Sequence, residues 1–247
     1  MTKVSVGWIV VVVVTVAAGL GVAQAQTFPD IHLDGGWKAW YFTLESRGQT
    51  GDGFMTGPVF SVDFDRKWTL GVAYLTTEIG KDVEATGRRA ERSDFDMSLR
   101  YRLLDQLGVY VSFKRLEFSL DDRKEGELQH GSINGIGFGL AGTLPVWQPS
   151  DHSTLFLSGS AAYLPLAWVD IVTRDPNATT RAKNNWFTAE ANVGYSTSLG
   201  PFLASVLLGY RLQNLTLETD SPRENNRTFQ AIHLLFYGPT LTATLRW

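Results

Sequence analysis

The sequence has no cysteine and, after residue 25, no second long apolar run. The missing thiols exclude a disulfide scaffold, thiol catalysis and a thiolate metal site. The missing apolar run excludes a mature protein that crosses a membrane with helices. The net charge of −3 at pH 7 argues against a nucleic-acid-binding protein. We also find no phosphate-binding loop and no spacing typical of metal ligands, so the sequence predicts neither a metal nor a cofactor.

The N-terminal segment has the three parts of a secretory signal peptide. Lys3 supplies a positive charge, residues 8–20 are mostly apolar, and the Ala-Gln-Ala of residues 23–25 is a small-residue cleavage site. The apolar run is short for a membrane-spanning helix, and no positive stop-transfer cluster follows it. The sequence therefore divides into a signal peptide (1–25), a periplasmic N-terminal lead (26–33) and one domain (34–247).

Polar and apolar residues alternate with a period of two through most of the domain, as in β-strands with one apolar face. The alternation predicts ten strands, at residues 34–46, 53–64, 67–79, 92–104, 107–120, 130–145, 153–169, 185–199, 201–218 and 227–247. Short and long connections alternate between them, as in barrels with short periplasmic turns and longer extracellular loops. We therefore predict an all-β fold, an up-and-down antiparallel barrel of ten strands, with eight or twelve strands as the alternatives.

The polar face of these strands indicates a transmembrane barrel. Residues 94–103 place five apolar side chains on one face and four charges on the other, and a soluble sandwich would turn that charged face outward. Aromatic residues recur near both strand ends, as at the two interfaces of a membrane. The segments 201–218 and 227–247 exceed the roughly 9 to 11 residues that cross a bilayer, so we expect the barrel to protrude on the extracellular side.

The C-terminal segment is an amphipathic strand that ends on an indole. Its apolar face consists of Leu241, Ala243, Leu245 and Trp247. The pattern resembles the C-terminal signature of bacterial outer-membrane β-barrels. That resemblance implies recognition by the barrel-assembly machinery and periplasmic chaperones, and insertion among the lipid and lipopolysaccharide of the outer membrane.

Side-chain parity predicts two layers in the lumen. The charged middle layer comprises Asp94, Asp96, Arg100, Arg102, Lys114, Glu190 and Arg211. The upper apolar layer comprises Leu116, Phe118, Leu120, Leu215, Leu217, Ile232, Leu234 and Phe236, to which the first strand adds Trp40, Phe42 and Leu44. Buried charges must pair, so we expect a salt-bridged plug, with a polar path or ion-selective constriction as the alternative. We expect the apolar layer to be sealed; a pocket for a hydrophobic or lipid ligand is the alternative, suggested by inward Gly135, Gly137 and Gly139.

Catalytic candidates are few. Asp94 and Asp96 resemble the paired aspartates of the omptin proteases, which also form protruding ten-stranded barrels, and the resemblance implies carboxylates that activate a water. That family also needs an Asp-x-His on another strand, which this sequence lacks. His130, at the predicted outer rim near Ser132, is the remaining candidate partner.

Three functions are compatible with these features. The sequence favours a nonenzymatic barrel with a structural or surface-interaction role, acting through loops such as residues 80–91 with the cluster Arg88, Arg89 and Arg92. The second is a narrow channel or uptake barrel for small or hydrophobic solutes. The third is an outer-rim hydrolase or lipid-modifying enzyme that uses Asp94, Asp96 and His130.

Overall fold

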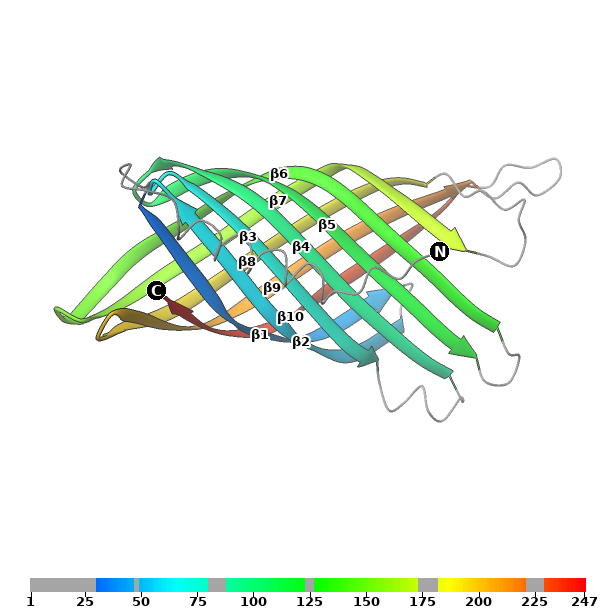
Figure 1. The fold of residues 1–247 in the computed structure, drawn as a ribbon. Coiled ribbons are helices and arrows are strands. Elements are labelled where there is room, and N and C mark those ends of the chain that lie inside the picture. The colour runs from blue at the N-terminus through cyan, green and yellow to red at the C-terminus, as the bar shows by residue number, and fades with distance from the viewer. Residues whose placement is uncertain (1–29, 47–48, 80–87, 123–126, 173–181, 221–228) are drawn as a thin grey trace, which may run out of the picture. The chain divides into compact units, whose positions relative to one another are not determined.

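The computed structural model describes residues 30–46, 49–79, 88–122, 127–172, 182–220 and 229–247. The predicted signal peptide lies outside these residues. Within the described ranges, ten antiparallel strands form a closed barrel in sequence order (Figure 1), which confirms the predicted fold. The strands are β1 (Ile31–Ser46), β2 (Gln49–Phe64), β3 (Trp68–Ile79), β4 (Arg88–Leu104), β5 (Leu107–Asp122), β6 (Glu127–Ser150), β7 (Ser153–Val172), β8 (Ala182–Leu199), β9 (Phe202–Asp220) and β10 (Phe229–Arg246).

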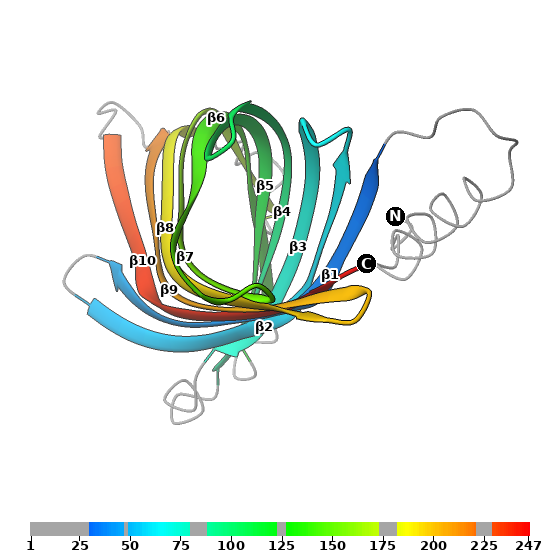
Figure 2. The same cartoon turned by 90° about the vertical axis from the view of Figure 1, so that its left-hand side faces the viewer.

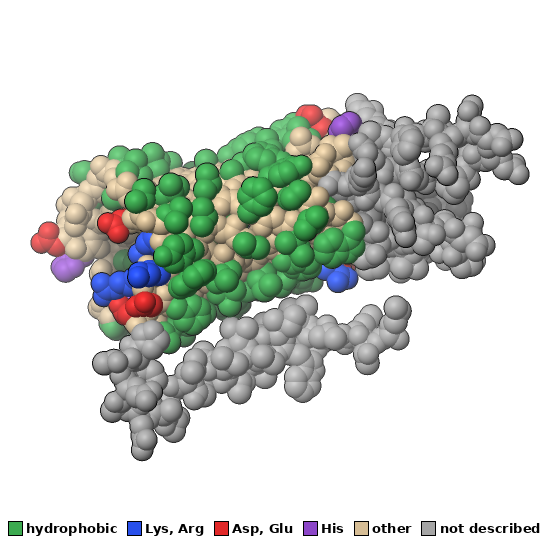
Figure 3. Space-filling view, turned by 90° about the horizontal axis from the view of Figure 1, so that it is seen from above, with side chains coloured by type: hydrophobic (Ala, Val, Ile, Leu, Met, Phe, Trp, Pro, Cys, Tyr) green, Lys and Arg blue, Asp and Glu red, His purple; other side chains and the backbone are tan. Residues whose placement is uncertain are grey.

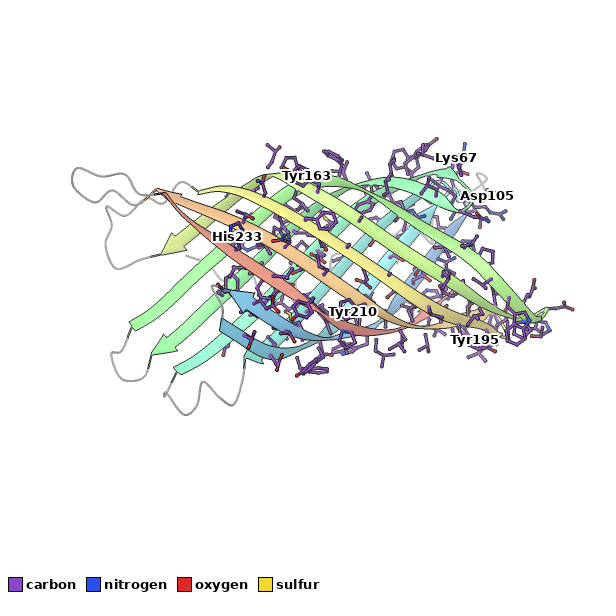
Figure 4. All side chains as sticks on the ribbon, turned by 180° about the vertical axis from the view of Figure 1, so that it is seen from behind. Lys67, Asp105, Tyr163, Tyr195, Tyr210 and His233 are labelled. Carbon is purple, nitrogen blue, oxygen red and sulfur yellow. The ribbon has the colours of Figure 1, made fainter. Side chains whose placement is uncertain are left out.

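One rim of the barrel carries short turns. Asp65 and Arg66 follow β2 with φ angles of 51° and 53°, the left-handed pair of a tight type I′ hairpin. Gly200, between β8 and β9, has a φ of 64°, which glycine adopts without steric cost. Lys67 and Asp105 mark this end in Figure 4, and the strands enclose the lumen when viewed from it (Figure 2).

Strand β6 is longer than the sequence indicates. We predict its end at Pro145, but it continues to Ser150. Pro145 is opposite Phe156, and the register shifts between Pro145 and Trp147. Proline cannot donate a ladder hydrogen bond, and a bulge is one of the places in a sheet that tolerate it. The turn before β7 is therefore shorter than expected.

The barrel closes where β1 pairs with β10. Asp34 is opposite Arg246, and the register continues to Glu45 opposite Leu235. Beyond the last ladder pair, Leu33 and Trp247 exchange two backbone hydrogen bonds of 3.1 and 3.0 Å. The seam is thus hydrogen-bonded up to the short-turn rim.

The outer wall is apolar over the middle of the strands (Figure 3). Outward side chains such as Leu99, Val111, Phe138 and Leu208 are exposed, Val111 by 58%. Tyr163, Tyr195 and Tyr210 lie on this outer face (Figure 4) and are exposed by 42–50%. The described part of the chain contains no helix long and apolar enough to cross a membrane.

The apolar belt ends before the strands do. On β3 the outward series changes from Val72 and Tyr74 to the polar Thr76, and on β5 from Phe113 to Arg115. At about 3.3 Å per residue and a tilt of about 40°, the 19 residues of β9 rise roughly 48 Å, about twice an apolar band of ~25 Å. The strands are therefore long enough to extend well beyond a bilayer.

Candidate functional site

An apolar layer fills the lumen on the side away from the short turns. Its fully buried members come from most of the strands, and Trp40, Phe42 and Phe236 pack with ring-centroid distances of 5.2 and 5.8 Å. The predicted Leu116, Phe118, Leu215, Leu234 and Phe236 all belong to this layer or pack on it. The side chains of Leu120, Leu217 and Ile232 lie outside the described residues.

Sequence reasoning missed several members of this layer. They are Met55, Leu75, Ile133, Ala162, Leu164 and Trp186. Each lies at an inward position of its strand, and the pairing of Leu116 with Ile133 shows the shared face directly. Applying the alternation of inward and outward side chains to every strand would have identified them.

The inward glycines of β6 leave no vacant space. A Cβ atom at Gly135 would lie 2.9 Å from Leu164 and 3.1 Å from Trp186. At Gly137 it would clash with the carbonyl oxygen of Tyr163, and at Gly139 with the Tyr110 ring. The idea that these glycines open a ligand pocket is therefore wrong, because neighbouring side chains already occupy the space they provide.

Arg92 joins the apolar layer to the charged one. It is 1% exposed, so its predicted membership of a surface cluster with Arg88 and Arg89 is wrong; β4 begins at Arg88 and turns this side chain inward. Its Nε and Nη2 donate to the two carboxylate oxygens of Asp94 at 2.8 and 2.7 Å. Nη2 also donates to Gln213 at 2.8 Å, and the guanidinium carbon lies 3.9 Å from the centroid of Phe236. Parity with Asp94, two residues away, was the signal that could have identified it.

The charged layer consists of ion pairs from five strands. Asp96 Oδ2 accepts from Lys114 and Arg211, both at 2.7 Å. Lys38, which sequence reasoning missed, donates to both oxygens of Glu190 at 2.7 and 2.5 Å. These side chains are mostly buried, and each charge has a close opposite partner, as a low-dielectric interior requires.

The two remaining charges of the predicted set lie nearer the short-turn rim. Arg100 is half-buried and donates to the carbonyl oxygen of Ala141 at 3.0 Å. Arg102 is exposed, beside the register shift between Arg102 and Leu104, and so lies apart from the ion pairs. A polar cavity of about 390 Å³ extends between Arg100 and the charged layer; we call it the chamber.

A further ion-pair cluster holds the short-turn rim. Arg246 binds both oxygens of Asp34 at 2.8 Å and one oxygen of Asp63 at 2.8 Å. Thr69 donates to Asp63 at 2.6 Å. The cluster connects β10, β1, β2 and β3 across the closing seam.

The catalytic candidates are not arranged as a hydrolytic pair. Asp94 is bound by the buried Arg92, and Asp96 is bound by two cations, which is the geometry of structural ion pairs. The His130 side chain lies outside the described residues, and Ser132 is buried on the opposite strand face from Ile133. In the described part of the chain, no group of three or more His, Asp or Glu side chains is placed to hold a metal ion.

The polarity of the two faces decides the class of fold. A closed antiparallel barrel that turns Leu, Val and aromatic side chains outward and buries charges inward suits a lipid environment. The chain has the fold of an outer-membrane β-barrel. The outward Leu241, Ala243, Leu245 and Trp247 lie at the exposed end of its last strand.

Comparison with solved structures finds bacterial membrane barrels at low sequence identity. Outer membrane protease OmpT from Escherichia coli is 16% identical, with 92% of this chain and 99% of that chain covered and a TM-score of 0.47. The translocator domain of autotransporter NalP from Neisseria meningitidis is 13% identical, with 94% and 92% covered and a TM-score of 0.46. Neisserial surface protein A is 12% identical, with 87% and 95% covered and a TM-score of 0.38. No protein-family model and no curated protein matches the sequence.

Proposed function

We propose that this chain is an integral outer-membrane barrel with a closed lumen, which has a structural or surface-interaction role. The supporting observation is the apolar layer, in which Trp40, Trp186, Phe42 and Phe236 are 0–1% exposed. Conduction requires a polar path that an ion can enter and leave. Here an ion would have to displace packed rings and separate Arg92 from Asp94.

The outer surface supports the same role. Its apolar belt fits the hydrocarbon of outer-membrane lipid, and the polar strand ends beyond the belt suit headgroups and lipopolysaccharide. The exposed apolar side chains at the end of β10 are accessible to the barrel-assembly machinery and its periplasmic chaperones. In this proposal the protein acts through its wall and loops.

Planar-bilayer recordings of the refolded protein test the closed lumen. We expect no stable unitary current from the wild type, and a current from Trp40→Ala, which removes one of the two tryptophan side chains of the apolar layer. Trp37→Ala is the matched control, because Trp37 lies on the outer face of the same strand and is 56% exposed. A stable unitary current from the wild type would contradict the proposal. So would a current from Trp37→Ala together with no current from Trp40→Ala.

A second candidate is an uptake barrel for small or hydrophobic solutes. The β2–β3 ladder ends at Thr56 opposite Thr76, although both strands continue beyond this pair. A cavity of about 640 Å³ lies there, and it is lined both by outward Phe54 and Tyr74 and by inward Arg92 and Phe118. We infer that the wall has a lateral opening at this point, beyond the apolar belt.

Cross-linking tests this second function. The chain has no native cysteine, so Met55→Cys with Thr77→Cys gives a single pair on the two strands that border the opening. Uptake predicts that a fluorescent fatty acid enters proteoliposomes and that a short bismaleimide stops its entry. Equal flux before and after cross-linking, or no flux above that of empty liposomes, would exclude the lateral route.

A further inference from the structure

The chamber has an unbalanced set of charges. Among the described residues that line it, four are cations, Lys38, Arg100, Lys114 and Arg211, and two are carboxylates, Asp96 and Glu190. Asp96 is shared by Lys114 and Arg211, and Glu190 is bound by Lys38. The lining therefore carries a surplus of two positive charges.

Arg100 is the cation of the chamber that takes part in none of these ion pairs. Within the described residues, the only hydrogen bond of Arg100 runs from Nη2 to the carbonyl oxygen of Ala141. Asp63 acts on it electrostatically, but that carboxylate is bound by Arg246 at 2.8 Å. Arg102, two residues further along β4, adds to the positive potential.

A second observation points into the same space. The hydroxyl of Ser112 is buried, lines the chamber and has no hydrogen-bond partner in the described structure. A buried hydroxyl without a partner costs about 1–3 kcal/mol. A guanidinium fork and a free hydroxyl that face one cavity are donors for an oxygen-rich acceptor.

We propose that the chamber binds a small oxyanion, a phosphate or a carboxylate, with Arg100 as its principal ligand and Ser112 as a further donor. An anion compensates the positive surplus, which is costly in a low-dielectric interior. The apolar layer separates the chamber from the opposite end of the barrel, so the anion enters from the short-turn end. This site goes beyond the proposed closed-barrel role and requires no path through the barrel.

Isothermal titration of the refolded full-length protein in detergent micelles tests the site. The probes are inorganic phosphate and, separately, acetate, at constant ionic strength set with chloride. We expect saturable binding of at least one probe, weakened about tenfold or more in Arg100→Gln, because a charge-assisted hydrogen bond is lost. Arg115→Gln is the matched control and should bind as the wild type does, because Arg115 is outward, 46% exposed and paired with Glu117.

Ser112→Ala provides a second variant that removes only the hydroxyl, and we expect it to weaken binding severalfold. Absence of saturable binding of both probes by the wild type overturns the proposal. Unchanged affinity in Arg100→Gln also overturns it, as does unchanged affinity in Ser112→Ala if Arg100→Gln fails to refold. Because binding is measured without a transmembrane gradient, its failure is distinct from a failure of the closed lumen in the conductance experiment.

Discussion

Replacing Arg92 with methionine tests whether buried ion pairing stabilises the barrel. The guanidinium donates to both oxygens of Asp94, binds Gln213 and lies 3.9 Å from the centroid of Phe236. Methionine retains most of the side-chain volume and its contacts with the rings. It removes the charge, so that Asp94, only 3% exposed, loses its partner.

The expected magnitude is large for a single substitution. Removing one partner of a buried ion pair costs about 3–5 kcal/mol, because the other charge remains desolvated. Loss of the cation–π contacts with Trp40, Phe42 and Phe236 adds about 1–2 kcal/mol. We therefore expect Arg92→Met to lower the free energy of unfolding by about 4–7 kcal/mol.

The double variant Arg92→Met with Asp94→Leu separates the ion pair from the packing. Replacing a buried pair by apolar residues is often neutral, so the double variant should lie within about 2 kcal/mol of the wild type. Urea unfolding in phospholipid vesicles, followed by the fluorescence of the eight tryptophans, measures all of the variants. The reasoning is refuted if Arg92→Met costs less than about 1 kcal/mol, or if the double variant is as unstable as the single one.

Three further perturbations address the wall, the belt and the seam. Gly137→Ala should lower the free energy of unfolding by about 1–3 kcal/mol, because its Cβ would meet the backbone of the next strand, whereas Gly159→Ala, with its nearest atom at 3.4 Å, should have little effect; equal urea midpoints would contradict this. Val111→Arg should lower the free energy of unfolding in vesicles by about 2–4 kcal/mol, and Thr76→Arg by at most about 1 kcal/mol. Equal losses would contradict the position at which the apolar belt is taken to end. Arg246→Met should speed amide hydrogen exchange at the end of β10 severalfold, and unchanged exchange would show that the rim cluster does not hold the seam.

The fold followed from the sequence because successive side chains along a strand of a membrane barrel alternate between the lipid and the lumen. The segment with alternating Phe95, Met97 and Leu99 lies in β4 as predicted, with its register to β5 intact as far as Arg102. Strand ends were less predictable. Pro145 looks like a terminator by local chemistry, and only the partner strand decides that a bulge accommodates it.

The lumen was predictable in its composition and less so in its contacts. Parity assigned Asp96, Lys114 and Arg211 to one face, but the sharing of one carboxylate by two cations depends on the curvature of the closed sheet. Because Arg88 and Arg89 precede it, Arg92 falls into a basic surface cluster by sequence, although it begins a predicted strand. Gly135 showed that space exists beside β6 without showing that Leu164 and Trp186 fill it.

The closing seam also determines when folding can be complete. In the described barrel, nine of the ten strand pairings join neighbours in the sequence, and only that between β1 and β10 is distant, with Asp34 and Arg246 separated by 212 residues. Hairpins can form locally and early, whereas a contact of such separation must overcome the entropy of closing the whole chain. Until it forms, β1 and β10 present two unpaired edges of the kind that promote aggregation. Barrel closure is therefore expected to be the slow, cooperative step of folding, and the step that most needs protection by a chaperone.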